Sequence, residues 1–280
     1  MIESDSGAGN CGSDCFNKVQ YLLCVTGNLD AAPLAADGAT TSVAPRFLDA
    51  GETALVVEFG ETVDPAINDR VLALDAALRA DPPAGTREFV PTYRSLMIHY
   101  DPLQIDRQTL VNLVHKAMAV SAQRTVAAAN WIIPCCYDPP FGEDIDEAAQ
   151  LLKIVRGDLI ARHTAATYRI YMYGFAPGQI YLGGVPEALA ISRRPAPRPP
   201  HQPGAVLIGG GLCVITNFAM PTGWYVIGRT PERLYAAART DAFLFQAGDN
   251  LRFEAIDATT FHALERRVAN GEVVARKSAA

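Results

Sequence analysis

The sequence lacks an apolar run long enough to cross a membrane, since a spanning helix needs about 18 consecutive apolar residues. Its nearest candidate, Val19 to Val25, is short and is interrupted by Gln20. The first residues, Met-Ile-Glu-Ser-Asp, are acidic, whereas a secretory signal begins with basic residues. The sequence therefore predicts a cytoplasmic protein that does not bind membranes.

An excess of basic residues is missing as well. The 280 residues include 24 Lys and Arg against 30 Asp and Glu, which gives a formal net charge of -6. A general nucleic-acid-binding protein would normally present a basic face. We therefore expect no nucleic-acid partner.

Paired metal-ligand arms are absent, although the chain contains six cysteines. Structural zinc sites usually need two arms of the C-x-x-C or H-x-x-x-H type. The cysteines do not form such arms: they are Cys11, Cys15 and Cys24 near the N-terminus, the adjacent Cys135 and Cys136, and the isolated Cys213. We expect free thiols and no metal site.

Common catalytic signatures are also missing. The chain has no G-x-x-x-x-G-K-[ST] phosphate loop and no G-x-S-x-G nucleophile elbow. Gly209-Gly210-Gly211 follows a predicted strand, but the helix that a dinucleotide site requires does not follow it. A tight bend between strands is the favoured interpretation, because glycine adopts such bends without strain. The acidic run from Glu143 to Glu147 fits the start of a helix better than an acid–base pair.

Hydrophobic residues make up 49% of the chain, enough to build a sizeable core. Residues 1–45 are mostly small and polar and predict a disordered leader. Residues 46–125 follow the order strand, helix, strand, strand, helix, which predicts a small ferredoxin-like α+β domain. Its first helix is expected after Asp64-Pro65, an N-cap followed by proline, and its second near Asp106.

A second domain is predicted over residues 130–262, after a short linker of small residues. It is expected to open with a strand at Trp131 and to continue with two short helices, Ile145 to Ile154 and Arg156 to His163. The remainder consists of short strands separated by Gly and Pro, which is typical of a β-barrel or sandwich. Residues 263–280 are predicted to be a short last helix and a frayed tail.

The most unusual segment lies between Tyr173 and Trp224. It contains Arg193, Arg194 and Arg198 in a proline-rich loop, and proline and glycine make such a loop stiff. Guanidinium groups bind carboxylate, phosphate or carbamate oxygens in a bidentate manner. The loop therefore predicts an anion-binding or partner-binding surface; a solvated basic loop is the alternative.

Several ordered motifs in this part of the chain resemble a known family. The run Gly174-Phe175-Ala176-Pro177-Gly178, with Tyr181-Leu182-Gly183-Gly184, is similar to the GF-x-PGF-x-YLGG motif of the family of 5-oxoprolinase B subunits. That family is also described as allophanate hydrolase subunit 1 or carboxyltransferase subdomain C/D, and it includes a sporulation histidine-kinase inhibitor. The resemblance spans about residues 46–261. It continues in register through Arg193-Arg194, Pro197-Arg198, Pro203 to Val206, Ile208 to Gly210, Pro221 to Trp224, Ile227 to Thr230 and Gly248 to Phe253.

The resemblance implies a cyclophilin-like β-barrel after the small α+β domain. It also implies a complex with C and A subunits that uses ATP to open 5-oxo-L-proline to L-glutamate; it does not say which subunit holds ATP. His163, at a position where the family commonly has His, and Arg198 are the candidate catalytic residues. The predicted substrate-binding or partner-binding residues are Gly174, Phe175, Pro177, Gly178, Tyr181, Gly183, Gly184, Arg193, Arg194, Arg198, Gly209, Gly210, Pro221, Gly223, Trp224 and Thr230.

Two other functions remain open within this family. One is a carboxyltransferase half-domain that acts on urea-like substrates with carboxybiotin, although no lysine here has the neighbours of a biotin attachment site. The other is a protein inhibitor of a sensor histidine kinase, which would share the same fold.

The chain departs from the family pattern at two places. Gln179 stands where the family usually has Phe, and Leu212-Cys213-Val214 stands where it usually has Gln-Thr-Gly. If that triplet contacts ligand in relatives, a polar contact is lost here, and the substrate is then expected to differ.

Overall fold

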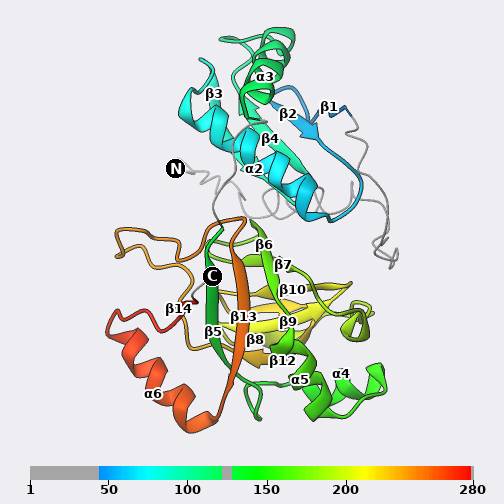
Figure 1. The fold of residues 1–280 in the computed structure, drawn as a ribbon, viewed down its shortest axis with the longest axis vertical. Helices are drawn as coiled ribbons and strands as arrows, with labels where there is room; N and C mark the ends of the chain where they lie inside the picture. Colours follow the sequence, from blue (N-terminus) through cyan, green and yellow to red (C-terminus); the bar gives the residue numbers. More distant parts are fainter. Residues whose placement is uncertain (1–43, 122–127, 279–280) are drawn as a thin grey trace, which may run out of the picture. The chain divides into compact units, whose positions relative to one another are not determined.

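The computed structural model describes residues 44–121 and 128–278 (Figure 1). The predicted leader, apart from its last two residues, and most of the predicted linker fall outside these ranges. The described chain contains a small four-stranded sheet with two helices, followed by a β-barrel with further helices.

The first sheet confirms the predicted α+β unit. Its elements are β1 (Arg46–Asp49), β2 (Ala54–Glu58), α2 (Pro65–Ala80), β3 (Thr86–Pro91), β4 (Ser95–Tyr100) and α3 (Arg107–Ser121). The strands are antiparallel to their neighbours in the order β1-β2-β4-β3. The arrangement of β2, β4 and β3 is that of a ferredoxin-like sheet, and the N-terminal hairpin supplies the fourth strand.

Both helices of this unit begin at the predicted aspartates. The Asp64 carboxylate accepts hydrogen bonds from the backbone N–H groups of Ala66 and Ile67, at 2.8 and 3.0 Å. Asp106 accepts the backbone N–H of Thr109 at 2.9 Å. These bonds satisfy donors that the first helical turn leaves unpaired, which is why Asp is favoured at these positions.

The second unit is a closed barrel of seven strands. They are β5 (Asn130–Cys136), β6 (Tyr168–Tyr173), β7 (Ile180–Gly183), β9 (Ala205–Gly209), β10 (Leu212–Ile215), β12 (Tyr225–Arg229) and β13 (Asn250–Ile256). They follow the order β12-β9-β10-β7-β6-β13-β5, and pairing between β12 and β5 closes the circle. The β13–β5 pair is parallel and the other pairs are antiparallel, so the barrel is mixed.

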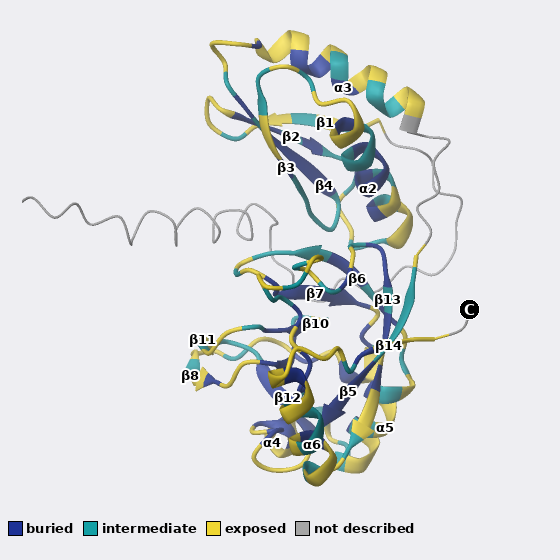
Figure 2. Ribbon diagram, turned by 90° about the vertical axis from the view of Figure 1, so that its left-hand side faces the viewer, coloured by how far each residue is buried: buried dark blue, intermediate teal, exposed yellow. Residues whose placement is uncertain are grey.

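Alternate residues of these strands fill the barrel. The interior contains Ile133, Ile170, Leu182, Ile208 and Leu251, all fully buried. Figure 2 shows the barrel strands largely in the colour for buried residues. The two predicted short helices are present as α4 (Ile145–Leu152) and α5 (Arg156–Ala165), and both contribute to this core.

Smaller elements surround the barrel. They are the 3-10 turn η1 (Glu187–Leu189), a two-stranded ribbon of β8 (Arg198–His201) and β11 (Met220–Thr222), the helix α6 (Ala258–Ala269) and the short strand β14 (Arg276–Lys277). Strand β7 was not predicted, since glycines and turn signals surround it. Among the described residues, no helix is both long and apolar enough to cross a membrane.

The prediction that the C-terminal tail is frayed is wrong for the residues up to Lys277. The carboxylate of Glu232 accepts the backbone N–H groups of Val274 and Ala275, each at 2.7 Å. β14 then pairs with β5. Local composition gave no sign of this, because the residue that holds the end lies more than 40 positions earlier in the sequence.

Candidate functional site

The glycine-rich motif begins in the hairpin that joins β6 to β7. Gly174 donates its backbone N–H to Gln179 at 3.2 Å, and Gln179 donates to Ala176 at 3.1 Å. Gly178 has a φ of +80°, and a Cβ added there would lie 2.3 Å from Cβ of Tyr235. The loop is therefore stiff and closely packed, and the role of Gly178 is to allow this close approach.

Other motif glycines also serve packing. A Cβ at Gly183 would lie 2.4 Å from the ring of Tyr171, and one at Gly184 would lie 2.7 Å from the carbonyl oxygen of Thr167. A Cβ at Gly209 would lie 3.2 Å from the indole of Trp224. Close packing therefore accounts for glycine at these positions, and no bound ligand is needed to explain it.

The tight bend predicted at the triple glycine is confirmed. Gly210 and Gly211 join β9 to β10 with φ values of +59° and +73°. A two-residue hairpin with both residues in the left-handed region favours glycine at both positions. The bend reverses the chain into β10 and not into a helix. These glycines therefore do not form the phosphate-binding turn of a dinucleotide site.

The motif strands share one side of the barrel wall. We call this side the outer face, defined by the buried residues Tyr181, Ala205, Leu207, Val214 and Val226. Met172 and Trp224 are partly buried against it. Because successive residues of a strand point to opposite faces, these side chains lie across the wall from the barrel interior.

Two of the three predicted arginines enter a charged cluster beside this wall. Arg194 pairs with Asp144 and Glu147, and its guanidinium carbon lies 4.4 Å from the centre of the Tyr225 ring. Arg198 pairs with Asp144 at 3.1 Å and with Glu143. We call Glu143, Asp144, Glu147, Arg194 and Arg198 the arginine–carboxylate cluster.

Asp144 is the centre of this cluster. Its Oδ1 lies 3.1 Å from Arg194, and its Oδ2 accepts both Arg198 and the backbone N–H of Val226, the latter at 2.8 Å. The side chains of Asp144, Arg194 and Arg198 are 11%, 15% and 13% exposed. The predicted helix-start acids therefore also neutralise the arginines, so these two guanidinium groups are already paired with anions.

Arg193 differs from both neighbours. Its side chain is exposed and makes no ion pair or side-chain hydrogen bond with any residue in the described ranges. A Cβ at Gly210 would lie 3.7 Å from Cγ of Arg193, and one at Gly223 would lie 3.8 Å from its Nη2. Arg193 thus lies along the glycine-rich end of the outer face.

His163, the candidate base, lies in the barrel core and is fully buried. Its Nδ1 is 2.7 Å from the hydroxyl of Tyr137, and its Nε2 is 3.8 Å from Sγ of Cys213. Burial lowers the pKa of His163 from 6.5 to about 3, so the imidazole is neutral near pH 7. This placement favours a structural role for His163 over contact with a substrate.

The thiols of Cys135 and Cys213 are buried in the same core. Burial raises the pKa of both, which keeps them protonated and weakly nucleophilic. Cys213 belongs to the triplet that departs from the family pattern, and it points inward, while its neighbour Val214 contributes to the outer face.

Gln179, the other departure, is 5% exposed. Its Nε2 donates to the hydroxyl of Tyr181 at 3.1 Å, but its Oε1 is buried with no hydrogen-bond partner among the described residues. An unpaired buried acceptor is destabilising by about 1–3 kcal/mol. Gln179 is therefore a polar position beside the outer face that packing alone does not explain.

The remaining predicted residues lie near the same strands but differ in role. Pro221 is exposed on β11, and the hydroxyl of Thr222 accepts the backbone N–H of Trp224 at 3.1 Å. Thr230 is buried, and its hydroxyl accepts the backbone N–H of Glu232 at 3.1 Å. Thr230 thus positions the carboxylate that holds the C-terminal segment.

Sequence reasoning missed Glu232 and gave Asp249 no structural role. Asp249 accepts the backbone N–H groups of Ala129 and Gln246 and the indole N–H of Trp131, at 2.9–3.0 Å. Both carboxylates are buried and hydrogen-bonded by several N–H donors. A lone acidic residue in a loop carries no local signal of such partners.

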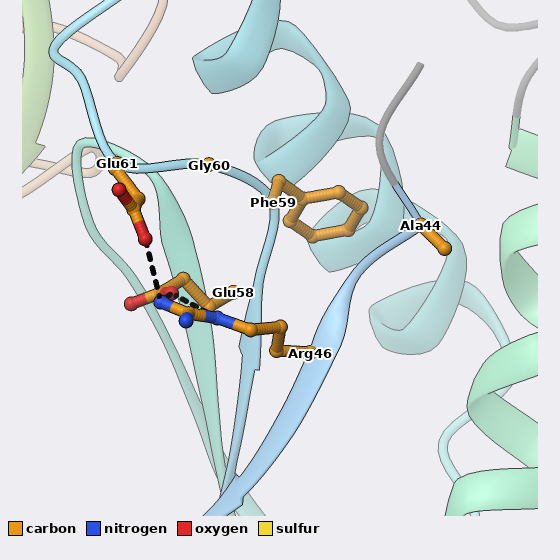
Figure 3. Close-up of a pocket in the computed structure, with 6 residues that line it drawn as sticks. All are labelled: Ala44, Arg46, Glu58, Phe59, Gly60 and Glu61. Carbon is orange, nitrogen blue, oxygen red and sulfur yellow. Dashed lines mark hydrogen bonds and ion pairs between the residues drawn. The ribbon is translucent and has the colours of Figure 1, made fainter. Parts of the chain in front are cut away.

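A pocket of about 320 Å³ lies in the first sheet and contains none of the predicted site residues (Figure 3). Ala44, Phe59 and Gly60 line it together with Arg46, Glu58 and Glu61. The Arg46 guanidinium is directed at the two glutamates. Its charged groups are thus paired with one another. A second pocket, of about 240 Å³, is lined in part by the predicted site residues Gly183 and Gly184. We take the outer face of the barrel as the candidate site, because most of the motif strands contribute to it.

Known proteins share both the sequence pattern and the fold. Residues 45–245 match the family described as carboxyltransferase domain, subdomain C and D. The B subunit of the 5-oxoprolinase of Bacillus subtilis (strain 168) is 30% identical over 224 residues, which cover 76% of this chain and 93% of that protein.

Two solved structures are also similar. The structure of TTHA0988 aligns with a TM-score of 0.65 at 34% identity, over 73% of this chain and 40% of that chain. The urea carboxylase of Kluyveromyces lactis aligns with a TM-score of 0.70 at 18% identity, over 84% of this chain and 24% of that chain. The chain thus spans less than half of either protein, and the second likeness concerns the fold alone.

Proposed function

The chain belongs to the family of 5-oxoprolinase B subunits, with its carboxyltransferase subdomain C and D, and from this we propose that it is the B subunit of an ATP-dependent 5-oxoprolinase. The complex would open 5-oxo-L-proline to L-glutamate together with A-like and C-like subunits. The observation that carries the proposal is the match to the Bacillus subtilis protein over 93% of its length.

The proposed chemistry explains why ATP would be needed. An unstrained lactam resists hydrolysis, and phosphorylation of its amide oxygen would create an activated imidate. Positive groups that neutralise the developing charge would favour that step. The proposal assigns no ATP contact to this chain.

The arrangement of candidate residues supports a subunit that does not act alone. His163 is buried, and Arg194 and Arg198 are paired with carboxylates. The outer face therefore offers an exposed cationic residue, Arg193, that pairs with no carboxylate or imidazole in the described ranges. Groups from partner subunits would have to complete the site.

The test is co-expression of the chain with its A-like and C-like partners, followed by an ATP-dependent assay of glutamate release from 5-oxo-L-proline. We expect turnover when all three proteins are present and none from this chain alone. Failure of the assembled complex to release glutamate would overturn the proposed activity. Turnover by the single chain would overturn its dependence on partners.

A further inference from the structure

The three arginines of the proline-rich loop use their charges differently. Arg194 and Arg198 are paired within the arginine–carboxylate cluster, and both side chains are mostly buried. Arg193 is exposed and has no such partner in the part of the chain that the structure describes. Since all three carry the same charge, the tertiary structure leaves Arg193 as the one available to a ligand.

The backbone on both sides of Arg193 is fixed. The N–H of Gly210 donates to the carbonyl of Ile191 at 2.7 Å, and the N–H of Arg194 donates to the carbonyl of Gly223 at 2.7 Å. These two bonds connect the arginine segment to the β9–β10 hairpin and to the entry of β12. A residue on a fixed backbone loses less conformational entropy when it binds a ligand.

Glycines keep the guanidinium group uncovered. The Arg193 side chain runs beside Gly210 and Gly223, where a Cβ would already lie within 4 Å of it. A larger side chain at either position would cover part of the arginine. The positive φ of Gly210 already favours glycine in the hairpin, whereas a Cβ at Gly223 would make only ordinary contact with Arg193, so packing does not explain Gly223.

Aromatic groups border this open end of the outer face. Trp224 follows Gly223 directly and packs on Gly209. Burial raises the pKa of Tyr181, and the hydrogen bond from Gln179 and the positive charge of Arg193 both oppose this rise. An exposed cation whose neighbouring backbone is held by these hydrogen bonds, with Trp224 next to Gly223, suits a small anion.

We propose that Arg193 binds the carboxylate of the substrate. This inference rests on the proposed function, in which 5-oxo-L-proline has a neutral lactam ring and one ionised carboxylate. The planar donor fork of arginine matches a carboxylate in a bidentate geometry. Arg193 would hold the substrate and orient it, and the groups that act on the lactam would come from elsewhere in the complex.

The partner subunits determine how strong this contact is. An ion pair exposed to water changes affinity by no more than about fivefold. A hydrogen-bonded charge pair that is shielded from water contributes about 1.5–3 kcal/mol, or roughly 10- to 150-fold in affinity. The contact is therefore expected to matter in the assembled complex and to be weak in the isolated chain.

The experiment compares two substrates and three variants in the assembled complex. The substrates are 5-oxo-L-proline and 5-oxo-L-prolinamide, which replaces the carboxylate by a neutral amide. The variants are Arg193→Gln, Arg193→Lys and the control Arg266→Gln, which removes an exposed arginine from the last turn of α6. Size-exclusion chromatography and melting temperature verify assembly and folding of each.

For Arg193→Gln we expect the KM for 5-oxo-L-proline to rise at least about tenfold, with kcat within about threefold of wild type. Its KM for the amide should stay within about twofold, because the amide has no charge to lose. Arg193→Lys should restore part of the affinity, and Arg266→Gln should behave as wild type.

Three results would overturn the inference while the wild-type complex still releases glutamate. They are an unchanged KM for the acid, an equal rise in KM for acid and amide, and loss of assembly in Arg193→Gln, which would assign the residue to a subunit interface. A wild-type complex without any turnover is a different result, because it overturns the proposed function itself.

Discussion

The two sides of the barrel wall satisfy their polar groups in different ways. Inside, His163, Tyr137 and Cys213 are neutral and contact one another in a fully buried core. Outside, the arginine–carboxylate cluster is charged and is held together by ion pairs, with Nε of Arg194 as its one buried group that lacks a hydrogen-bond partner among the described residues. The comparison shows that residue types typical of catalysis can serve only packing and ion pairing. Arg193 is the residue that takes part in neither arrangement.

The largest effect on this comparison is expected from Asp144→Ala. The change leaves Arg194 and Arg198 without their shared partner, and the backbone N–H of Val226 loses its acceptor. Removal of one member of a mostly buried ion-pair group is strongly destabilising, so we expect a loss of about 3 kcal/mol in the free energy of unfolding. Urea denaturation of the isolated chain measures it.

Asp146→Ala is the matched control, because it lies in the first turn of the same helix with a side chain that is 74% exposed. Its change should stay within about 0.5 kcal/mol. If Asp144→Ala is no more destabilising than this control, the outer cluster is a solvated surface and the contrast with the interior disappears.

The interior is tested by the pH dependence of stability. The pKa of His163 is about 3 in the folded chain, below its ordinary value of 6.5, because burial disfavours the charged imidazole. Between these values the unfolded chain binds a proton that the folded chain does not. Stability is therefore fully present above pH 6.5 and falls as the pH is lowered, by about 1.4 kcal/mol per pH unit from this group.

His163→Gln removes the titrating group and keeps polar atoms near Tyr137. Urea denaturation at pH 6 and pH 5 should show that wild type loses about 1.2 kcal/mol more than the variant over this interval. Parallel losses in the two proteins would mean that His163 takes up its proton in the folded chain, contrary to the buried, neutral placement.

The smallest effect concerns the hairpin at the end of the outer face. Gly211 has a φ of +73°, and a Cβ there would meet nothing within 4 Å. Gly211→Ala should therefore lower the unfolding free energy by about 1 kcal/mol through the backbone alone. Gly211→Asn should be less destabilising, because Asn tolerates this conformation better. Equal losses for both variants would show that something other than φ requires glycine.

Much of the fold could be predicted from short-range patterns. Asp64-Pro65 and Asp106 indicated the two helices of the first unit because a capping carboxylate acts within three residues of its own position. Gly210 and Gly211 indicated a bend for an equally local reason. Strand β7 could not be predicted in this way, because it is short and lies among glycines.

The candidate site could be predicted as a region but not in its details. The motif between Gly174 and Trp224 indicated the outer face, since its residues are ordered and characteristic of the family. The roles of His163 and the three arginines could not be assigned. Residue type gives the chemistry a side chain can perform, and only burial and pairing determine whether it is free to perform it.

The sequence by itself determined the helix starts and the glycine hairpin, because each depends on neighbouring residues. It also determined the family, because ordered motifs can be compared along the chain without knowing which residues meet in space. Only the tertiary structure decided that Arg198 meets Asp144, 54 positions away, and that His163 meets Cys213, 50 positions away. It also decided that Glu232 holds the end of the chain. Such pairings depend on how the strands close into a barrel, and that closure brings together groups whose separation along the chain carries no local signal.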